Sequence, residues 1–172
     1  MQIIHLSPFW TVIVDVCAWA FFHLVISFGM LKVPDRYFAQ KKDWFQPKEW
    51  EEDGKVWQKW LSIQDWKRHL PDGTLFLKSG YDKSRLNGSD LETLEQFITE
   101  TKRAEVTHWL SMLPAGLFFL WNPPGAGWVM VAYAVLFNLP FILSQRYNRP
   151  RLERIHQRKK ARTQLNKESR PV

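Results

Sequence analysis

The chain has 172 residues, of which 24 are lysine or arginine and 17 are aspartate or glutamate, so its formal net charge is +7. By length it forms one domain, residues 1 to 172, and its mean hydropathy of −0.33 averages apolar stretches with a highly charged remainder. The one cysteine, Cys17, excludes an internal disulfide and a cysteine-based zinc site. We therefore expect no metal centre.

An apolar run from Pro8 to Met30 predicts the first transmembrane helix. Its 23 residues are interrupted only by Asp15 and His23 and can cross a hydrocarbon core of about 30 Å. No basic segment precedes the run, which favours an anchor over a cleaved signal peptide. Ionisable residues within a membrane point to function. The alternative is that each bonds a Ser, Thr or Asn on a neighbouring helix, so the roles of Asp15 and His23 stay open.

The segment from residue 32 to residue 105 combines charge with tryptophan. It holds 14 basic and 14 acidic residues, and this neutrality argues against nucleic acid as a partner. Tryptophan favours the bilayer interface, because its ring is apolar while its N–H needs a polar partner. We expect a helix from Glu49 to Ser62 on the membrane surface, with Trp50, Trp57 and Trp60 near one side. A soluble subdomain with a Trp-rich core is the alternative.

One long helix is predicted from Ser89 to Trp121, starting in water and ending in lipid. Ser89 and Glu92 form a capping box at its start, and Val106 to Trp121 is the second predicted span. Seven residues share one face by their spacing: Leu91, Leu94, Ile98, Thr101, Glu105, His108 and Met112. Turning an ionisable group to lipid costs about 2.5 kcal/mol or more, so Glu105 and His108 should face the protein interior or a polar cavity.

Glu105 and His108 are the candidates for acid–base chemistry. A carboxylate one helical turn from a histidine can orient the imidazole and stabilise its cation. A pair that only ties the helix to its neighbours has the same spacing. Asp72 lies in a turn and could also reach a hydroxyl held in the membrane, whereas His69 stands in a short basic stretch and is expected to be solvated.

The third predicted span, Ala126 to Ser144, follows a short turn and completes a helical hairpin. Pro140 should kink this helix near Asn138. The tail from residue 145 to residue 172 holds 10 basic and 2 acidic residues, so the positive-inside rule places it and the central segment in the cytoplasm, with the N-terminus outside. The expected fold is an all-α integral membrane protein with three transmembrane helices, a cytoplasmic Trp-rich interfacial segment and a basic C-terminal tail.

Arg146, Asn148 and Arg149 stand where the last span is expected to leave the membrane. Arginine can clamp a phosphate in a forked geometry, and simple positive-inside anchoring is the alternative. Thr101 and Arg103 complete the set of candidate binding residues. Membrane lipids are expected partners, and the oligomeric state stays open.

Known catalytic motifs are absent from the sequence. It contains no His-x4-Asp box, G-x-S-x-G elbow, Walker loop, G-x-G-x-x-G or H-E-x-x-H motif. Three spans are also too few for the large multi-pass O-acyltransferases. These observations leave a small membrane enzyme, or a membrane-bound interaction protein, that acts at the cytoplasmic interface.

Five stretches of the sequence together point to one protein family. They are residues 33–38 (VPDRYF), 54–60 (GKVWQKW), 72–73 (DG), 100–105 (ETKRAE) with 108–109 (HW), and 145–152 (QRYNRPRL). In order and spacing they resemble one small bacterial family, the glycosyl-4,4'-diaponeurosporenoate acyltransferases of staphyloxanthin-type carotenoid synthesis. The resemblance covers roughly residues 33 to 152, and Asp15, His23 and His69 gain nothing from it.

This resemblance implies the last step of such a pathway, in which a fatty acyl group is transferred to a sugar hydroxyl of a glycosylated C30 carotenoid. The acyl donor would be acyl-CoA or another acyl thioester, and no cofactor is expected. His108 would take the hydroxyl proton, with Glu105 or Glu100 orienting its ring. Arg146 and Arg149 would hold donor phosphates or the developing oxyanion. A non-enzymatic scaffold for pathway enzymes is the competing function, and glycosyl transfer is disfavoured because it normally needs a sizeable α/β domain.

Overall fold

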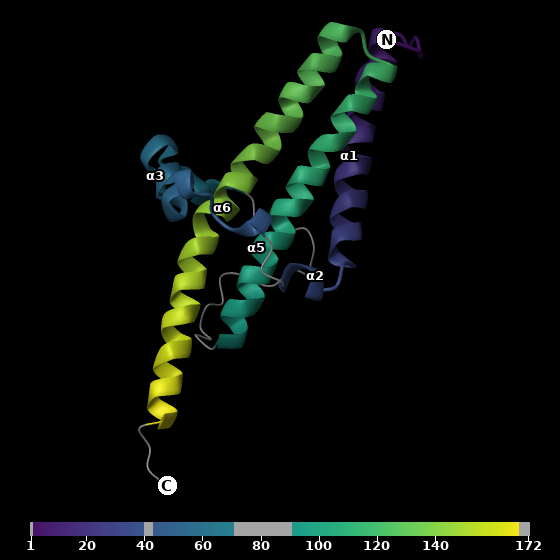
Figure 1. Ribbon diagram of the computed structural model, residues 1–172. Helices are drawn as coiled ribbons and strands as arrows, with labels where there is room; N and C mark the ends of the chain where they lie inside the picture. The colour runs from purple at the N-terminus through teal and green to yellow at the C-terminus, as the bar shows by residue number, and fades with distance from the viewer. Residues whose placement is uncertain (1, 40–42, 71–90, 169–172) are drawn as a thin grey trace. The chain divides into compact units, whose positions relative to one another are not determined.

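The computed structural model describes residues 2–39, 43–70 and 91–168, and every regular element in these ranges is helical. The expected all-α class is therefore confirmed (Figure 1). The α-helices are α1 (Pro8–Leu31), α2 (Arg36–Ala39), α3 (Lys55–Leu61), α4 (Ile63–Trp66), α5 (Leu91–Met112) and α6 (Pro124–Glu168). The 3-10 helices are η1 (Asp43–Phe45), η2 (Glu49–Gly54), η3 (Lys67–His69) and η5 (Leu113–Leu120).

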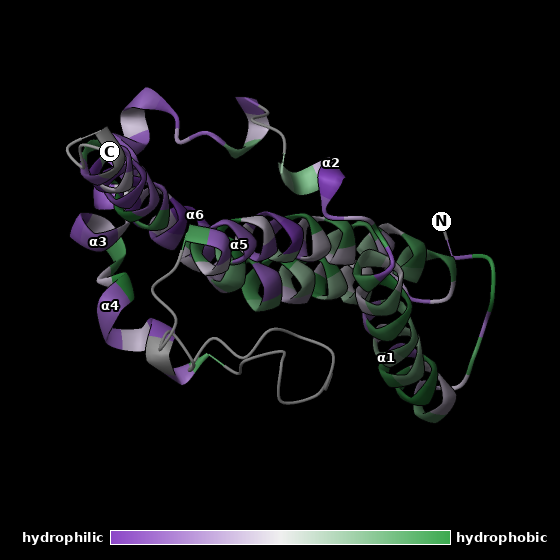
Figure 2. Cartoon of the chain, turned by 90° about the horizontal axis from the view of Figure 1, so that it is seen from below, coloured by the Kyte–Doolittle hydropathy of each residue, from purple (hydrophilic) through white to green (hydrophobic). Residues whose placement is uncertain are grey.

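Two helices in the described ranges are long and apolar enough to cross a membrane. They are Pro8–Leu31, which is α1, and Pro124–Asn166, which is most of α6. Figure 2 shows α1 hydrophobic over most of its length, whereas the C-terminal part of α6 is hydrophilic. The predicted third span and basic tail are thus one continuous helix through Glu168.

The prediction of one helix from Ser89 to Trp121 was wrong at its C-terminal end. The α-helical geometry stops at Met112 and the chain continues as η5. Pro114 explains this change, because proline lacks the N–H that would bond four residues back and its ring collides with that carbonyl. The expected span from Val106 to Trp121 is therefore divided between two helix types, and Ser89 lies outside the described residues.

The predicted helix from Glu49 to Ser62 is also interrupted. Glu52, Asp53 and Gly54 have φ values of 46°, 56° and 82°, which separates η2 from α3. A Cβ at Gly54 would come within 3.1 Å of a backbone oxygen of Arg146, so both the backbone conformation and the close contact with α6 require glycine there.

The chain divides into two compact units. The first comprises Met1–Tyr37 with Arg103–Ile142, and the second comprises Phe38–Lys102 with Leu143–Val172. Helices α5 and α6 contribute residues to both units.

The core of the first unit joins α1, η5 and α6. Trp19 stacks on Phe118 at 4.6 Å between ring centroids, and Ala115 and Ala134 complete the buried cluster. Figure 1 shows α1, which carries Trp19, running beside the helical hairpin that carries the other three residues. Helices in lipid associate through close packing rather than through burial from water, and small residues allow that approach.

Asp15 links α1 to the hairpin turn. This carboxylate is 7% exposed and accepts hydrogen bonds of 2.7 Å from Trp121 Nε1 and from Asn122 Nδ2, both on Oδ1. Of the two interpretations left open for Asp15, these contacts favour the bond to a neighbouring helix.

Candidate active site

His108 lies in the first unit between α5 and α6. Its ring stacks on Phe141 with centroids 4.5 Å apart and an interplanar angle of 11°. Its Nδ1 lies 3.0 Å from Oδ1 of Asn138, thirty residues along the chain. Two side chains of α6 therefore hold the orientation of the imidazole.

The amide of Asn138 also determines which ring nitrogen carries the proton. Its Nδ2 donates to the carbonyl of Ala134 at 2.9 Å, so Oδ1 faces His108 as an acceptor. Nδ1 of His108 must then be the donor, and in a neutral imidazole the basic lone pair is on Nε2. Asn138 is 0% exposed, so water does not compete for this bond. The arrangement prepares Nε2 of His108 to accept a proton.

The carboxylates predicted to assist His108 have different surroundings. Glu105 is fully buried in the same unit, one helical turn before His108. Glu100 is half-buried and belongs to the second unit. Asp72 lies outside the described residues. His69 is exposed, in agreement with its expected solvation.

Arg146 forms its forked contact with a carboxylate of the protein. Its Nε donates to Oε1 of Glu51 at 2.7 Å, and Nη2 donates to Oε2 at 2.6 Å. Glu51 is 1% exposed and also accepts from Trp57 Nε1 and from the backbone N–H of Lys48. Burial alone would raise the pKa of Glu51, but the hydrogen bonds from Arg146 and Lys48, with the positive charge of Arg146, lower it overall.

Arg149 and Thr101 meet each other in the second unit. Arg149 is 1% exposed, and its guanidinium donates to Oγ1 and O of Thr101 and to the carbonyl of Phe45. The guanidinium carbon also lies 5.3 Å from the centroid of the Phe45 ring. These bonds connect α5, η1 and α6 within the unit.

Arg103 caps the C-terminal end of α1 within the first unit. It donates to the carbonyls of Met30 at 2.9 Å and Val33 at 3.0 Å and pairs with the carboxylate of Asp35. A cation at this position donates hydrogen bonds to carbonyls that have no partner within the helix. It also interacts favourably with the negative end of the helix dipole. Each of the three candidate arginines thus binds groups of the protein itself.

A second basic cluster surrounds Tyr147. Lys67 lies 4.8 Å and Arg151 4.0 Å from the centroid of its ring, and Lys67 donates to Oδ1 of Asn148 at 2.8 Å. Burial and the nearby charge of Arg151 lower the pKa of Lys67. The hydroxyl of Tyr147 is buried without a hydrogen-bond partner in the part of the chain that the structure describes. Two adjacent cations and an unpaired hydroxyl are suited to an anionic group.

The residues that sequence reasoning missed lie far along the chain from their partners. The sequence indicates Asn138 only as the position of a kink, and it gives no signal for the roles of Glu51 and Lys67. A polar amide within an apolar run was the available signal for Asn138, because such a group must find a partner. Within the described ranges, no three His, Cys, Asp or Glu side chains gather as metal ligands.

Comparison with known proteins places the chain beside one enzyme family. Residues 41–158 match the profile of the glycosyl-4,4'-diaponeurosporenoate acyltransferases. The chain is 37% identical over 137 residues to the enzyme of that name from Staphylococcus aureus strain MRSA252, which covers 80% of this chain and 82% of the relative. The enzyme of strain Newman is 38% identical over the same length. No solved structure matches the chain significantly.

Proposed function

Because this chain belongs to the glycosyl-4,4'-diaponeurosporenoate acyltransferase family, we propose that it acylates the sugar of a glycosylated carotenoid at a site built around His108. Family membership confirms the resemblance noted in the sequence and supplies the reaction class and the acceptor. The observation that supports His108 is its bond to Asn138, which leaves the basic lone pair on Nε2.

The proposed reaction needs one base and no cofactor. Nε2 of His108 accepts the proton of a sugar hydroxyl as the hydroxyl oxygen attacks the carbonyl carbon of an acyl thioester. The tetrahedral intermediate then collapses, the C–S bond breaks, and the leaving thiolate takes the proton back from the imidazolium. The products are the sugar ester and a thiol. The hydrogen bond that Nδ1 donates to Oδ1 of Asn138 and the stacked ring of Phe141 keep the imidazole oriented through both proton transfers.

Within the second unit, we propose the basic cluster around Tyr147 as a binding site for an anionic group. Arg146 and Arg149 were the first candidates, but their forked contacts are made with Glu51 and with Thr101. Lys67 and Arg151 lie against one ring, and the hydrogen bond that Lys67 makes is to a neutral amide. A phosphate beside them would relieve the repulsion between the two cations.

Mass analysis of pigments tests the reaction class directly. A host that makes the glycosylated carotenoid should gain a pigment heavier by one fatty acyl group when it also makes this protein. The matched control is the same host with the His108→Ala variant at equal protein level, which should keep the unacylated pigment. An unchanged pigment with the wild-type chain would favour the scaffold function instead.

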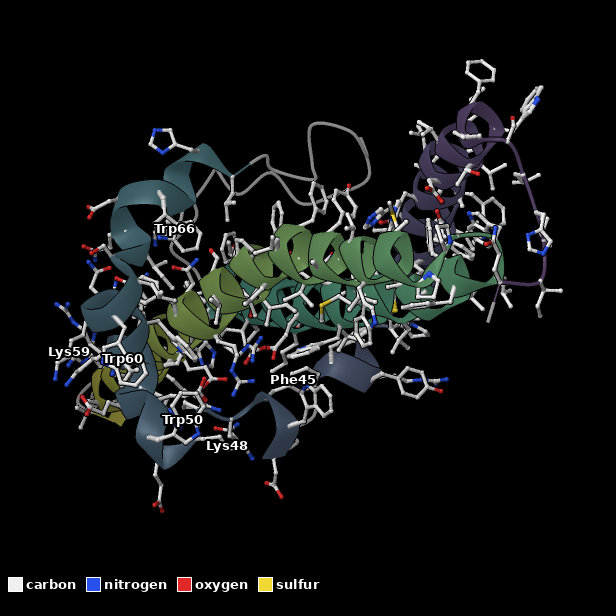
Figure 3. The ribbon with its side chains drawn as sticks, turned by 90° about the horizontal axis from the view of Figure 1, so that it is seen from above. Phe45, Lys48, Trp50, Lys59, Trp60 and Trp66 are labelled. Carbon is white, nitrogen blue, oxygen red and sulfur yellow. The ribbon has the colours of Figure 1, made fainter. Side chains whose placement is uncertain are left out.

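Membrane placement follows from the helices and the charge. We propose three crossings, by α1, by the segment from Val106 to Trp121 in α5 and η5, and by the apolar part of α6, with the N-terminus outside and the central segment and the tail in the cytoplasm. Three tryptophans of the second unit are more than half exposed: Trp44 at 57%, Trp50 at 57% and Trp60 at 71%. Lys59 adjoins Trp60 in this segment (Figure 3). Exposed indole rings beside lysines suit the headgroup region of a bilayer.

Cysteine labelling tests this topology. In a Cys17→Ser background, Ser7→Cys should react with an impermeant reagent added to intact cells, because Ser7 precedes α1 and is exposed. Lys59→Cys should react only after the membrane is opened. Labelling of Lys59→Cys from outside in intact cells would refute the proposed orientation.

A further inference from the structure

Three aromatic residues of α6 follow one another on a single face. Tyr133, Phe137 and Phe141 are spaced by four residues, so they lie above one another over about 12 Å of helix. The rings of Tyr133 and Phe137 are 5.5 Å apart and inclined by 21°, and those of Phe137 and Phe141 are 6.1 Å apart. We call these three residues the aromatic strip.

Every ring of the aromatic strip is supported by a ring from another helix. The pairs are Tyr133 with Trp19 at 5.1 Å, Phe137 with His23 at 5.5 Å, and Phe141 with His108 at 4.5 Å. The supporting rings fix the orientation of the strip, while Tyr133 stays 40% and Phe137 46% exposed. The strip is thus a preordered, partly open surface that ends at the proposed base.

His23 adds an unsatisfied polar atom beside this surface. Its ring also stacks on Trp19, with centroids 5.4 Å apart. Its Nε2 is buried and has no hydrogen-bond partner among the described residues. A buried polar atom without a partner is costly, and the cost is removed when a ligand supplies the missing bond. An oxygen of a bound acceptor can do so.

We propose that the conjugated chain of the glycosylated carotenoid lies along the aromatic strip, with an oxygen of its glycosyl ester head bonded to Nε2 of His23 and a sugar hydroxyl at His108. This inference rests on the proposed function. A polyene is flat and polarisable, so it gains contact over the whole face of a ring, whereas a saturated lipid chain matches that face less well. Continuity of the strip with His108 brings the head of the acceptor to the base.

The test compares two acceptors of the purified enzyme, a glycosyl ester of a polyene acid and a glycosyl ester of a saturated acid. The double variant Tyr133→Leu, Phe137→Leu should raise KM for the polyene acceptor about tenfold and raise KM for the saturated acceptor much less. The matched control is Trp128→Leu, since Trp128 is a 66% exposed ring of α6 outside the strip, and this change should alter neither KM. Equal effects on both acceptors, or none, would overturn the proposal.

A binding measurement separates this inference from the reaction itself. The visible absorption band of the polyene acceptor should shift when the wild-type protein is added without donor, and the double variant should lose the shift at the same concentration. This readout needs no turnover, so a wild-type protein that binds but does not acylate would refute the proposed function alone. Absence of any shift of the absorption band with the wild-type protein would refute the proposal that the polyene binds along the aromatic strip.

The role of His23 is tested by a variant that keeps its ring. His23→Phe preserves the stack on Trp19 and removes Nε2. We expect it to raise KM about fivefold for both acceptors, because both carry the glycosyl head. If the nitrogen only packs against its neighbours, His23→Phe should leave both KM values unchanged, and that result would remove His23 from the acceptor site.

Discussion

His108→Ala should lower the rate of acylation about 10² to 10⁴ fold, the range expected when a general base is removed. Insertion into the membrane and protein level should not change, because the half-buried ring is replaced by a smaller apolar side chain. The measurement is product formed per molecule of purified protein. Normal acylation by His108→Ala would end the general-base hypothesis.

Asn138 should show its positioning role in the same assay. Asn138→Ala removes the bond to Nδ1, so the ring can rotate and place its lone pair on the wrong nitrogen. We expect a loss of kcat smaller than that of His108→Ala, with KM for the acceptor unchanged. Asn122→Ala is the matched control, because it also removes a buried amide of the first unit, one that bonds Asp15. Equal losses of kcat in the two variants would reduce Asn138 to a structural residue.

Glu105 should matter less than His108. Glu105→Gln keeps the size and hydrogen-bonding capacity of the side chain and removes its charge, so any help it gives to the imidazolium is reduced rather than abolished. A moderate loss of kcat in Glu105→Gln would indicate electrostatic assistance to His108. An unchanged kcat would indicate that Glu105 only anchors α5.

Local sequence patterns predicted the long apolar helix α1 closely, but they predicted neither the interruptions of the other helices nor the partners of the polar side chains. The apolar run from Pro8 to Met30 corresponds to α1 within one residue, because hydropathy over twenty residues is a strong signal. The interruption at Glu52 and Asp53 had no such signal, since left-handed φ values are uncommon for residues other than glycine. Periodicity within α5 pointed to His108, but its partner Asn138 lies on another helix, which i, i+3 spacing cannot reveal.

The arginines also show that a sequence pattern can predict the geometry of a contact without identifying the partner. The forked geometry expected of Arg146 is present in the structure, but its partner is Glu51, 95 residues earlier. A cluster of arginines near a predicted membrane exit fits phosphate binding, anchoring and internal ion pairs equally well. Only the tertiary contact distinguishes among these uses.

The second large effect is expected at Glu51, where Glu51→Ala should destabilise the second unit by about 3–5 kcal/mol. The loss is large because Arg146, whose side chain is 15% exposed, would keep its charge without the carboxylate that compensates it. Thermal or denaturant unfolding of the solubilised protein, followed by tryptophan fluorescence, measures the change. Glu49→Ala is the matched control, since Glu49 is an exposed acid of the same 3-10 helix and should contribute about 0–1 kcal/mol.

The dependence of this effect on pH follows from the lowered pKa of Glu51. Burial opposes ionisation, but the bonds from Arg146 and Lys48 outweigh it, so the folded pKa lies below the ordinary value of 4.5. A depressed carboxylate pKa contributes stability that is complete above about pH 4.5 and is lost as the pH falls through the folded pKa. The difference in unfolding free energy between wild type and Glu51→Ala should therefore be constant near neutrality and shrink in acid. A difference that grew in acid would show that the carboxylate is not the ionised partner of Arg146.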